Sequence, residues 1–327
     1  MSLEERLYDF YPFDEAVITA VSDVAARHEG RLLREIAGGY GVSLHWHQDQ
    51  PMSESIRVVE YLDMHGHEHA SRDQANVLFT PLDASVRSRA VMQQALHLFG
   101  VDPTKRLLVV GGPPPLGIAN TIRFGDMHKT WKGQLHDAVD PVLSLLKQKG
   151  IKDINVLGQQ YGAELAAETA IKVHRQQNDR YPNVERVNAG VFIEPLAVKA
   201  RSRGDIARAQ QPIDPNESRF ARAGKAASRY RFTNYVVSKA MGRDGFKDRL
   251  ATALTAHPEL RSTVVWSDSS DTTDPERLQD AVSELRANFS RSRVGAIALE
   301  GAHTADFKDS ALLTAVMLQG LRNATAA

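Results

Sequence analysis

The chain has 327 residues, of which 42% are hydrophobic and 24% charged, a composition typical of a globular protein with a substantial core. Its 40 Lys and Arg residues balance its 40 Asp and Glu residues, so no net charge recruits nucleic acid or an anionic membrane. The absence of cysteine excludes disulfides, thiolate metal sites and cysteine nucleophiles.

The first residues, MSLEERLYDFYPF, contain acidic side chains and no apolar run, so we expect no signal peptide. No stretch reaches the ~18 to 20 apolar residues that a membrane span needs. We therefore expect a soluble protein without a membrane span, cytoplasmic by default. Incorporation into a particle is compatible with the sequence.

Apolar residues recur at helical spacing through FDEAVITAVSDVAARHEGRLLREIAG, and Gly38 and Gly39 supply a stop. The pattern predicts an N-terminal helical arm over residues 1–50. Two extended runs within 56–81 flank residues 63–66 and predict a hairpin.

From residue 86 onward, amphipathic helices alternate with short apolar strands. We expect helices over 86–100, 134–150, 163–176 and 276–289, and strands over 106–112, 154–158, 187–195, 262–268 and 295–303. This alternation predicts an α/β fold, with a mostly parallel sheet covered by helices on both faces. The sheet core would comprise 51–195 and 251–327.

One segment, 196–250, contains no clear buried strand. Between residues 199 and 231 it has nine Lys and Arg residues against three Asp and Glu residues. We interpret it as a basic, helical, solvent-facing insertion between two strands of the sheet. Such a surface suits an acidic partner, such as a protein or a phosphate-bearing ligand.

The stretch GQQYG, residues 158–162, follows a buried strand and precedes a helix. Its spacing matches the turn Gly-x-nucleophile-x-Gly, in which glycines avoid collisions between strand and helix. Gln160 stands at the nucleophile's position, beside Tyr161. An amide is a poor nucleophile, and an imidazole cannot activate it as it activates a hydroxyl.

Three further stretches are notable together with this turn. LLVVGGPPPLG at 107–117 precedes it in the chain, and VVWSDSSDTTDPERL at 264–278 and IALEGAHTADF at 297–307 follow it in that order. With them the chain resembles the α/β-hydrolase family over roughly residues 56–325. The resemblance implies an acid at Asp268 or Asp271, a histidine at His303, and 196–250 as a cap over the site. It also implies oxyanion-type amides at Gly112 and Tyr161, although Pro113 has no N–H to donate.

Each of these features has a plainer interpretation that stays open. A strand–glycine–helix junction occurs in most doubly wound folds. Asp268 and Asp271 could cap the helix that begins near residue 274, and His303 could be an ordinary loop histidine. The order of turn, acid and histidine is better evidence than any single feature.

The leading hypothesis is a catalytically inactive, hydrolase-like protein with a binding or structural role, possibly within a larger assembly. It implies a protein partner, a possible small-molecule ligand under the cap and no cofactor. The alternative is an esterase or amidase in which His303 and Asp268 or Asp271 activate water without a covalent step. The two hypotheses differ in whether the chain turns over esters.

A third hypothesis is a metal-dependent hydrolase. His65, His67 and His69 alternate in MHGHEH, a spacing that places side chains on one face of a strand. His45 and His47 repeat the pattern. Because residues 65 and 66 fit a hairpin turn, solvated histidines are the plainer interpretation, and we expect no metal. RYRFTNY at 229–235 interleaves aromatics with arginine, but it is too short to predict a nucleic-acid partner.

Overall fold

A computed structural model of the chain describes residues 2–42, 45–47, 58–63, 71–81, 86, 89–111, 135–177, 184–195, 245–270, 273–303, 306–307 and 309–325. Most of the basic insertion, the histidines at 65, 67 and 69, Gly112 and Asp271 lie outside these residues. The predictions made for them stay predictions.

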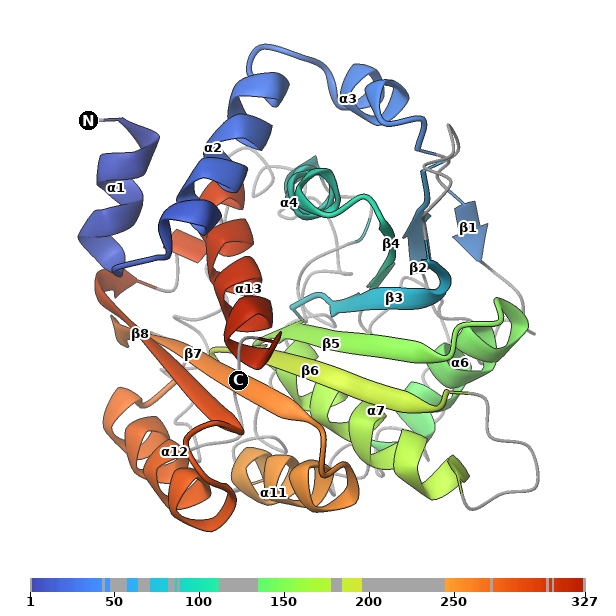
Figure 1. Ribbon diagram of the computed structural model, residues 1–327, viewed down its shortest axis with the longest axis vertical. Helices are drawn as coiled ribbons and strands as arrows, with labels where there is room; N and C mark the ends of the chain where they lie inside the picture. Colours follow the sequence, from blue (N-terminus) through green and yellow to red (C-terminus); the bar gives the residue numbers. More distant parts are fainter. Residues whose placement is uncertain are drawn as a thin grey trace, which may run out of the picture.

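The described strands form one sheet in the order β1-β2-β4-β3-β5-β6-β7-β8 (Figure 1). β1 and β2 run antiparallel to their neighbours, and β3 to β8 pair in parallel. The mostly parallel α/β fold is therefore confirmed. The bounds are β1 His45–His47, β2 Val58–Tyr61, β3 Ser71–Phe79, β4 Lys105–Val110, β5 Asp153–Gln159, β6 Arg186–Ile193, β7 Arg261–Ser269 and β8 Val294–His303.

Helices cover both faces of the sheet, and each face has its own hydrophobic cluster (Figure 1). One layer contains α6 (His136–Gln148), α7 (Tyr161–Gln177), α11 (Phe246–Ala256) and α12 (Pro275–Phe289). The other contains α4 (Arg89–Val101) and α13 (Ser310–Thr325). α11 begins inside the range predicted for the insertion and packs on α7. The four helices expected from residue 86 onward are all present.

The hairpin predicted within 56–81 is wrong, because β4 lies between β2 and β3. β2 pairs antiparallel with β4, and β3 pairs parallel with it. All residues of β4 except the first are buried, so this apolar strand takes a place inside the sheet and separates the two runs.

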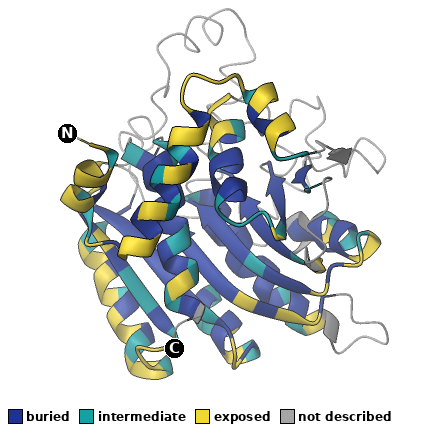
Figure 2. Cartoon of the chain, turned by 45° about the horizontal axis from the view of Figure 1, so that its top comes forward, coloured by how far each residue is buried: buried dark blue, intermediate teal, exposed yellow. Residues whose placement is uncertain are grey.

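The N-terminal segment forms α1 (Leu3–Phe10), α2 (Glu15–His28) and α3 (Leu33–Gly39). α2 turns buried apolar residues toward α4 and α13, and its outer face is exposed (Figure 2). The Asp14 N–H donates to Gln319 Oε1 over 2.9 Å, which joins the start of α2 to α13. The segment is thus part of the helical layer on this face.

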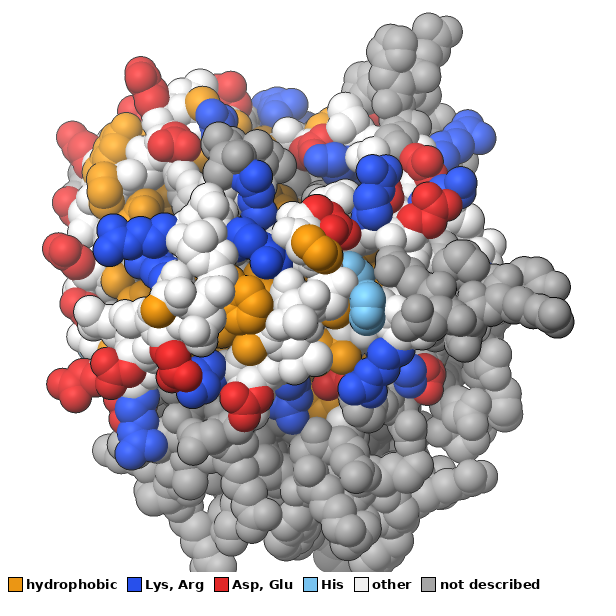
Figure 3. Space-filling view, turned by 60° about the horizontal axis from the view of Figure 1, so that its bottom comes forward, with side chains coloured by type: hydrophobic (Ala, Val, Ile, Leu, Met, Phe, Trp, Pro, Cys, Tyr) orange, Lys and Arg blue, Asp and Glu red, His pale blue; other side chains and the backbone are white. Residues whose placement is uncertain are grey.

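On the face shown in Figure 3, acidic and basic side chains are intermixed.

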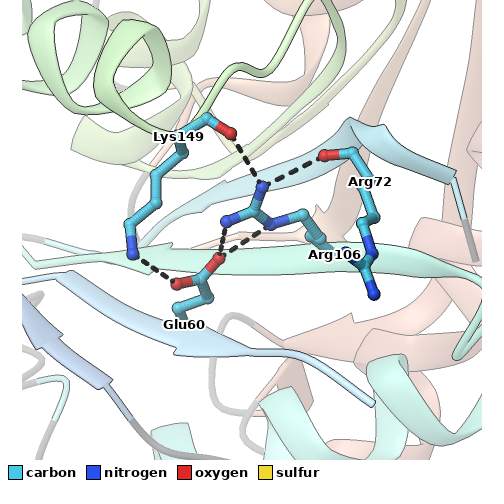
Figure 4. A network of polar contacts seen from close by, with 4 residues as sticks. All are labelled: Glu60, Arg72, Arg106 and Lys149. Atoms are coloured by element: carbon cyan, nitrogen blue, oxygen red, sulfur yellow. Dashed lines mark hydrogen bonds and ion pairs between the residues drawn. The ribbon is translucent and has the colours of Figure 1, made fainter. Parts of the chain in front are cut away.

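A buried ionic network joins β2, β4, β3 and the residue after α6 (Figure 4). Glu60 is 1% exposed and accepts a 2.7 Å bond from Arg106 Nε at Oε1, while Lys149 Nζ lies 3.2 Å from Oε2. Arg106 also donates to the carbonyls of Arg72 and Lys149. Burial raises the pKa of Glu60, but bonds and charges from Arg106 and Lys149 outweigh it and hold the pKa below its usual value.

We expect Glu60→Gln to lower the free energy of unfolding by about 3–5 kcal/mol, because it leaves the buried Arg106 and the partly exposed Lys149 without their carboxylate. The measurement is urea unfolding at pH 7. Since the folded pKa of Glu60 is depressed, its contribution is present above the unfolded pKa and is lost as pH falls through the folded value.

The control is Glu284→Gln, which breaks the exposed pair between Lys247 and Glu284. An exposed pair contributes roughly 1 kcal/mol or less. Equal losses in the two variants would contradict a structural role for the network.

Candidate functional site

The turn between β5 and α7 consists of one residue, Gln160, because β5 ends at Gln159 and α7 begins at Tyr161. Gln160 has a φ of 54°, a left-handed conformation that is uncommon for a residue with a side chain. Its N–H donates to the Ile193 carbonyl at the end of β6 over 2.7 Å, and its own carbonyl accepts from the Ala163 N–H. The apex of the predicted turn is therefore held at the carboxyl edge of the sheet.

Neither flanking glycine has room for a side chain. A Cβ at position 158 would lie 2.6 Å from the Ala163 nitrogen, and a Cβ at position 162 would lie 2.7 Å from the Phe79 carbonyl carbon. Both distances are shorter than real Cβ contacts. The two glycines are thus required by the close approach of α7 to β5 and β3, as the spacing of GQQYG predicts.

Tyr161 is fully buried at the start of α7 and belongs to the hydrophobic cluster on that face of the sheet. Burial raises the pKa of its phenol, with the charge of Arg249 opposing this and that of Glu164 adding to it. The side chain is therefore a neutral core group, and the oxyanion role predicted at this position concerns the backbone amide alone.

Glu194 is a candidate site residue that the sequence reading missed. It follows β6 directly after Ile193, so it is the neighbour of Gln160 across the strands. It is 0% exposed, has a φ of 47°, and accepts a 2.8 Å hydrogen bond from Ser267 Oγ. The one available signal was a glutamate in FIEP, between an apolar strand and a proline.

Two non-glycine residues with left-handed backbone thus stand side by side at the exits of β5 and β6. Such conformations cost on the order of 1–3 kcal/mol each and cluster at functional sites. The Thr273 hydroxyl donates to the Pro195 carbonyl, which ties this edge to the segment before α12. The carboxyl ends of β5 and β6 therefore carry two residues with strained backbone, held in place by hydrogen bonds.

Asp268 lies at the exposed end of β7, where Oδ2 accepts a 3.1 Å hydrogen bond from the Gly301 N–H. It does not cap the following helix. The N-cap of α12 is Asp274, whose side chain accepts from the Arg277 N–H. The acid role of Asp268 stays a prediction.

His303 is the last residue of β8, as the strand predicted over 295–303 placed it, with its backbone paired to Ser269. Its side chain is exposed, and its backbone N–H donates to Asp306 Oδ2 over 2.7 Å. Strands β6 and β7 separate β5 from β8, so at ~4.8 Å per strand β5 and β8 lie about 14 Å apart sideways. The end of β5 is level with Ile297, and β8 continues beyond that level to His303. Within the described ranges, no side-chain hydrogen bond joins His303 to Gln160 or Asp268.

Three of the five histidines in the metal hypothesis, His65, His67 and His69, lie outside the described residues. The other two, His45 and His47, are the first and last residues of β1. Among the residues that the structure describes, no group of three or more His, Asp or Glu side chains is arranged to hold a metal ion. Those residues also include no helix that is both long enough and apolar enough to cross a bilayer.

We expect Gly162→Ala and Gly158→Ala each to destabilise the fold by about 3 kcal/mol or more, because each Cβ would overlap backbone atoms that cannot rotate away. Thermal or urea unfolding measures this. The matched control is Gly38→Ala in α3, where a Cβ meets nothing within 4 Å. A gain of about 0.5–1 kcal/mol is expected there, and losses of the same size at all three sites would contradict the tight turn.

Neither the protein-family models nor the curated protein sequences give a match to this chain. Its structure is similar to carboxyl esterase 2 from the mycorrhizal fungus Tuber melanosporum, with a TM-score of 0.52 and 12% identity over 87% of this chain and 85% of that one. A carboxylesterase from the thaumarchaeon Nitrososphaera gargenis gives 0.51 and 12% over 87% and 99%. A protein from Thermoplasma acidophilum, predicted to be a CIB-like hydrolase, gives 0.51 and 12% over 86% and 100%.

At such low identities the likeness concerns the fold. The chain therefore has the α/β-hydrolase fold.

Proposed function

We propose that this chain is a catalytically inactive protein of the α/β-hydrolase fold that acts by binding, as a component of a protein assembly. The observation that carries the proposal is Gln160, which stands at the apex of the one-residue turn with a φ of 54°. The turn keeps its strained backbone and both of its tight glycines, but the side chain at its apex is an amide.

The chemistry at the apex decides between binding and covalent catalysis. A serine hydrolase needs a hydroxyl that a histidine can deprotonate, and a carboxamide provides none. Loss of the nucleophile reduces turnover on the order of 10^6-fold, so a chain selected for ester hydrolysis would seldom retain this change. A fold does not specify chemistry. A fold that is retained for binding can lose its nucleophile while it keeps the turn that positioned it.

The polar contacts at the edges of β7 and β8 support the same proposal. The carboxylate of Asp268 accepts from the backbone of Gly301, and His303 is held in the strand ladder opposite Ser269. These contacts stabilise the ends of the strands. They give no support to a water-activating pair, which needs the acid to orient the imidazole.

We expect the protein to hydrolyse a panel of p-nitrophenyl acetate, butyrate and octanoate no faster than buffer. Gln160→Ser should stay within about tenfold of that background, because a new hydroxyl lacks an adjacent base. His303→Ala serves as the control and should change nothing. Turnover in the unaltered protein that disappears in His303→Ala would overturn the proposal in favour of the water-activating hydrolase.

The binding role has its own measurement. Native mass spectrometry of the protein, purified from its source cells without denaturation, should show a defined stoichiometric complex. A free monomer that turns over esters would contradict the proposal. Stoichiometric zinc that is lost in His67→Ala would instead support the metal-dependent hydrolase.

A further inference from the structure

A cluster of three aromatic side chains joins the N-terminal helices to α4. His28 is the last residue of α2, Tyr40 is the C-cap of α3, and His97 lies within α4. His28 Nε2 is 2.7 Å from the Tyr40 hydroxyl, and the rings of His28 and His97 have their centroids 4.8 Å apart. The two histidines therefore touch at the point where three helices meet.

Both histidines are buried, with exposures of 7% for His28 and 5% for His97. Among the described residues, neither ring nitrogen of His97 has a hydrogen-bond partner, and His28 Nδ1 has none either. A buried polar atom without a partner costs free energy, and a buried charge without one costs far more. The packed cluster thus tolerates imidazoles only in their neutral form.

The charged groups around the pair reinforce this preference. Arg27 lies with Cζ 5.9 Å from the centre of the Tyr40 ring, and both Arg27 and Arg31 act on His28 as positive charges. Asp309 faces His97 from the segment before α13. Its carboxylate pairs with Arg6 and accepts from the Ala311 and Leu312 N–H groups, so it is already engaged.

Burial is the main reason that the pKa of His28 falls to about 4, and the charges of His97, Arg27 and Arg31 add to it. Burial also lowers the pKa of His97, although Asp309 opposes this. Two imidazoles in ring contact, with no third ligand among the described side chains, do not form a zinc site.

We propose that His28 and His97 form an acid-sensitive latch that holds α2 and α3 against α4 at neutral pH and releases them when the pair takes up protons. Opening places both rings in water, where an imidazole binds a proton near pH 6.5. Because the closed state binds fewer protons than the open one, closure is favoured above that pH. The preference for the closed state weakens progressively as the pH falls toward the pKa values that the two histidines have in that state.

Release of α2 would uncover an apolar surface. The helix contributes Val17, Ile18 and Val21 to the same hydrophobic cluster as Leu96, Leu98 and Phe99 of α4. This cluster also includes residues of α13 and of one face of the sheet. The latch therefore controls access to the apolar surface of α4 and α13 that α2 covers.

Hydrogen exchange followed by mass spectrometry tests the latch in the full-length protein. After correction for intrinsic exchange, we expect the opening equilibrium constant of the backbone amides in peptides within 15–40 to be about tenfold or more higher at pH 5 than at pH 7. Peptides of β5 and β6 should keep their protection. The double variant His28→Gln, His97→Phe should reduce the increase within 15–40 to less than about threefold, because neither position then titrates.

His97→Leu is a second, smaller change that keeps the test available if the double variant does not fold, and it should reduce the increase. His257→Gln is the matched control, since His257 is buried on the opposite face of the sheet and bonds to the Ala170 carbonyl. It should leave the increase within 15–40 intact. Protection of α2 and α3 that is equal at pH 7 and pH 5 would overturn the proposal, as would an increase retained in the double variant.

Discussion

The close approach of α7 to β5 and β3 is the constraint on which the site depends. The chain changes from strand to helix within one residue, and the flanking backbone atoms are too near for a Cβ at position 158 or 162. Any residue at position 160 is therefore held with a left-handed backbone at the carboxyl edge of the sheet. The turn fixes where the side chain stands, and the identity of that side chain then decides what chemistry is available.

The fold was predictable to the extent that burial leaves a pattern in the sequence. Strands buried on both faces are continuous apolar runs, and this pattern located β4, β5, β6 and β7 with their helices. Strand pairing leaves no such pattern. The runs on either side of residues 63–66 were expected to pair, but β4, more than 25 residues further along the chain, lies between them. Glu60 explains part of this, because its ionic partner Arg106 is on β4.

The candidate site was predictable at the turn and less so elsewhere. Glycine spacing predicts a backbone conformation directly, so Gln160 could be placed from GQQYG alone. Glu194 could not, because its significance depends on two facts that only the structure contains: its complete burial and its position next to Gln160 across the strands. His303 was placed at the end of the strand predicted over 295–303, and β8 ends there, with His303 paired to Ser269.

Two groups of buried ionisable side chains both lose their contribution to stability in acid, but over different ranges of pH. Glu60 is bonded to Arg106 and paired with Lys149, so its pKa lies below the usual value and its ionic network persists to a lower pH than the charge of an ordinary glutamate. Among the described residues, three ring nitrogens of His28 and His97 have no hydrogen-bond partner, so the cost of charging them appears as soon as water-exposed histidines begin to bind protons. Between these two limits the proposed latch would open while the ionic network at Glu60 remains intact. In that range the proposed latch would change the surface of the molecule on the side of α2 and α3.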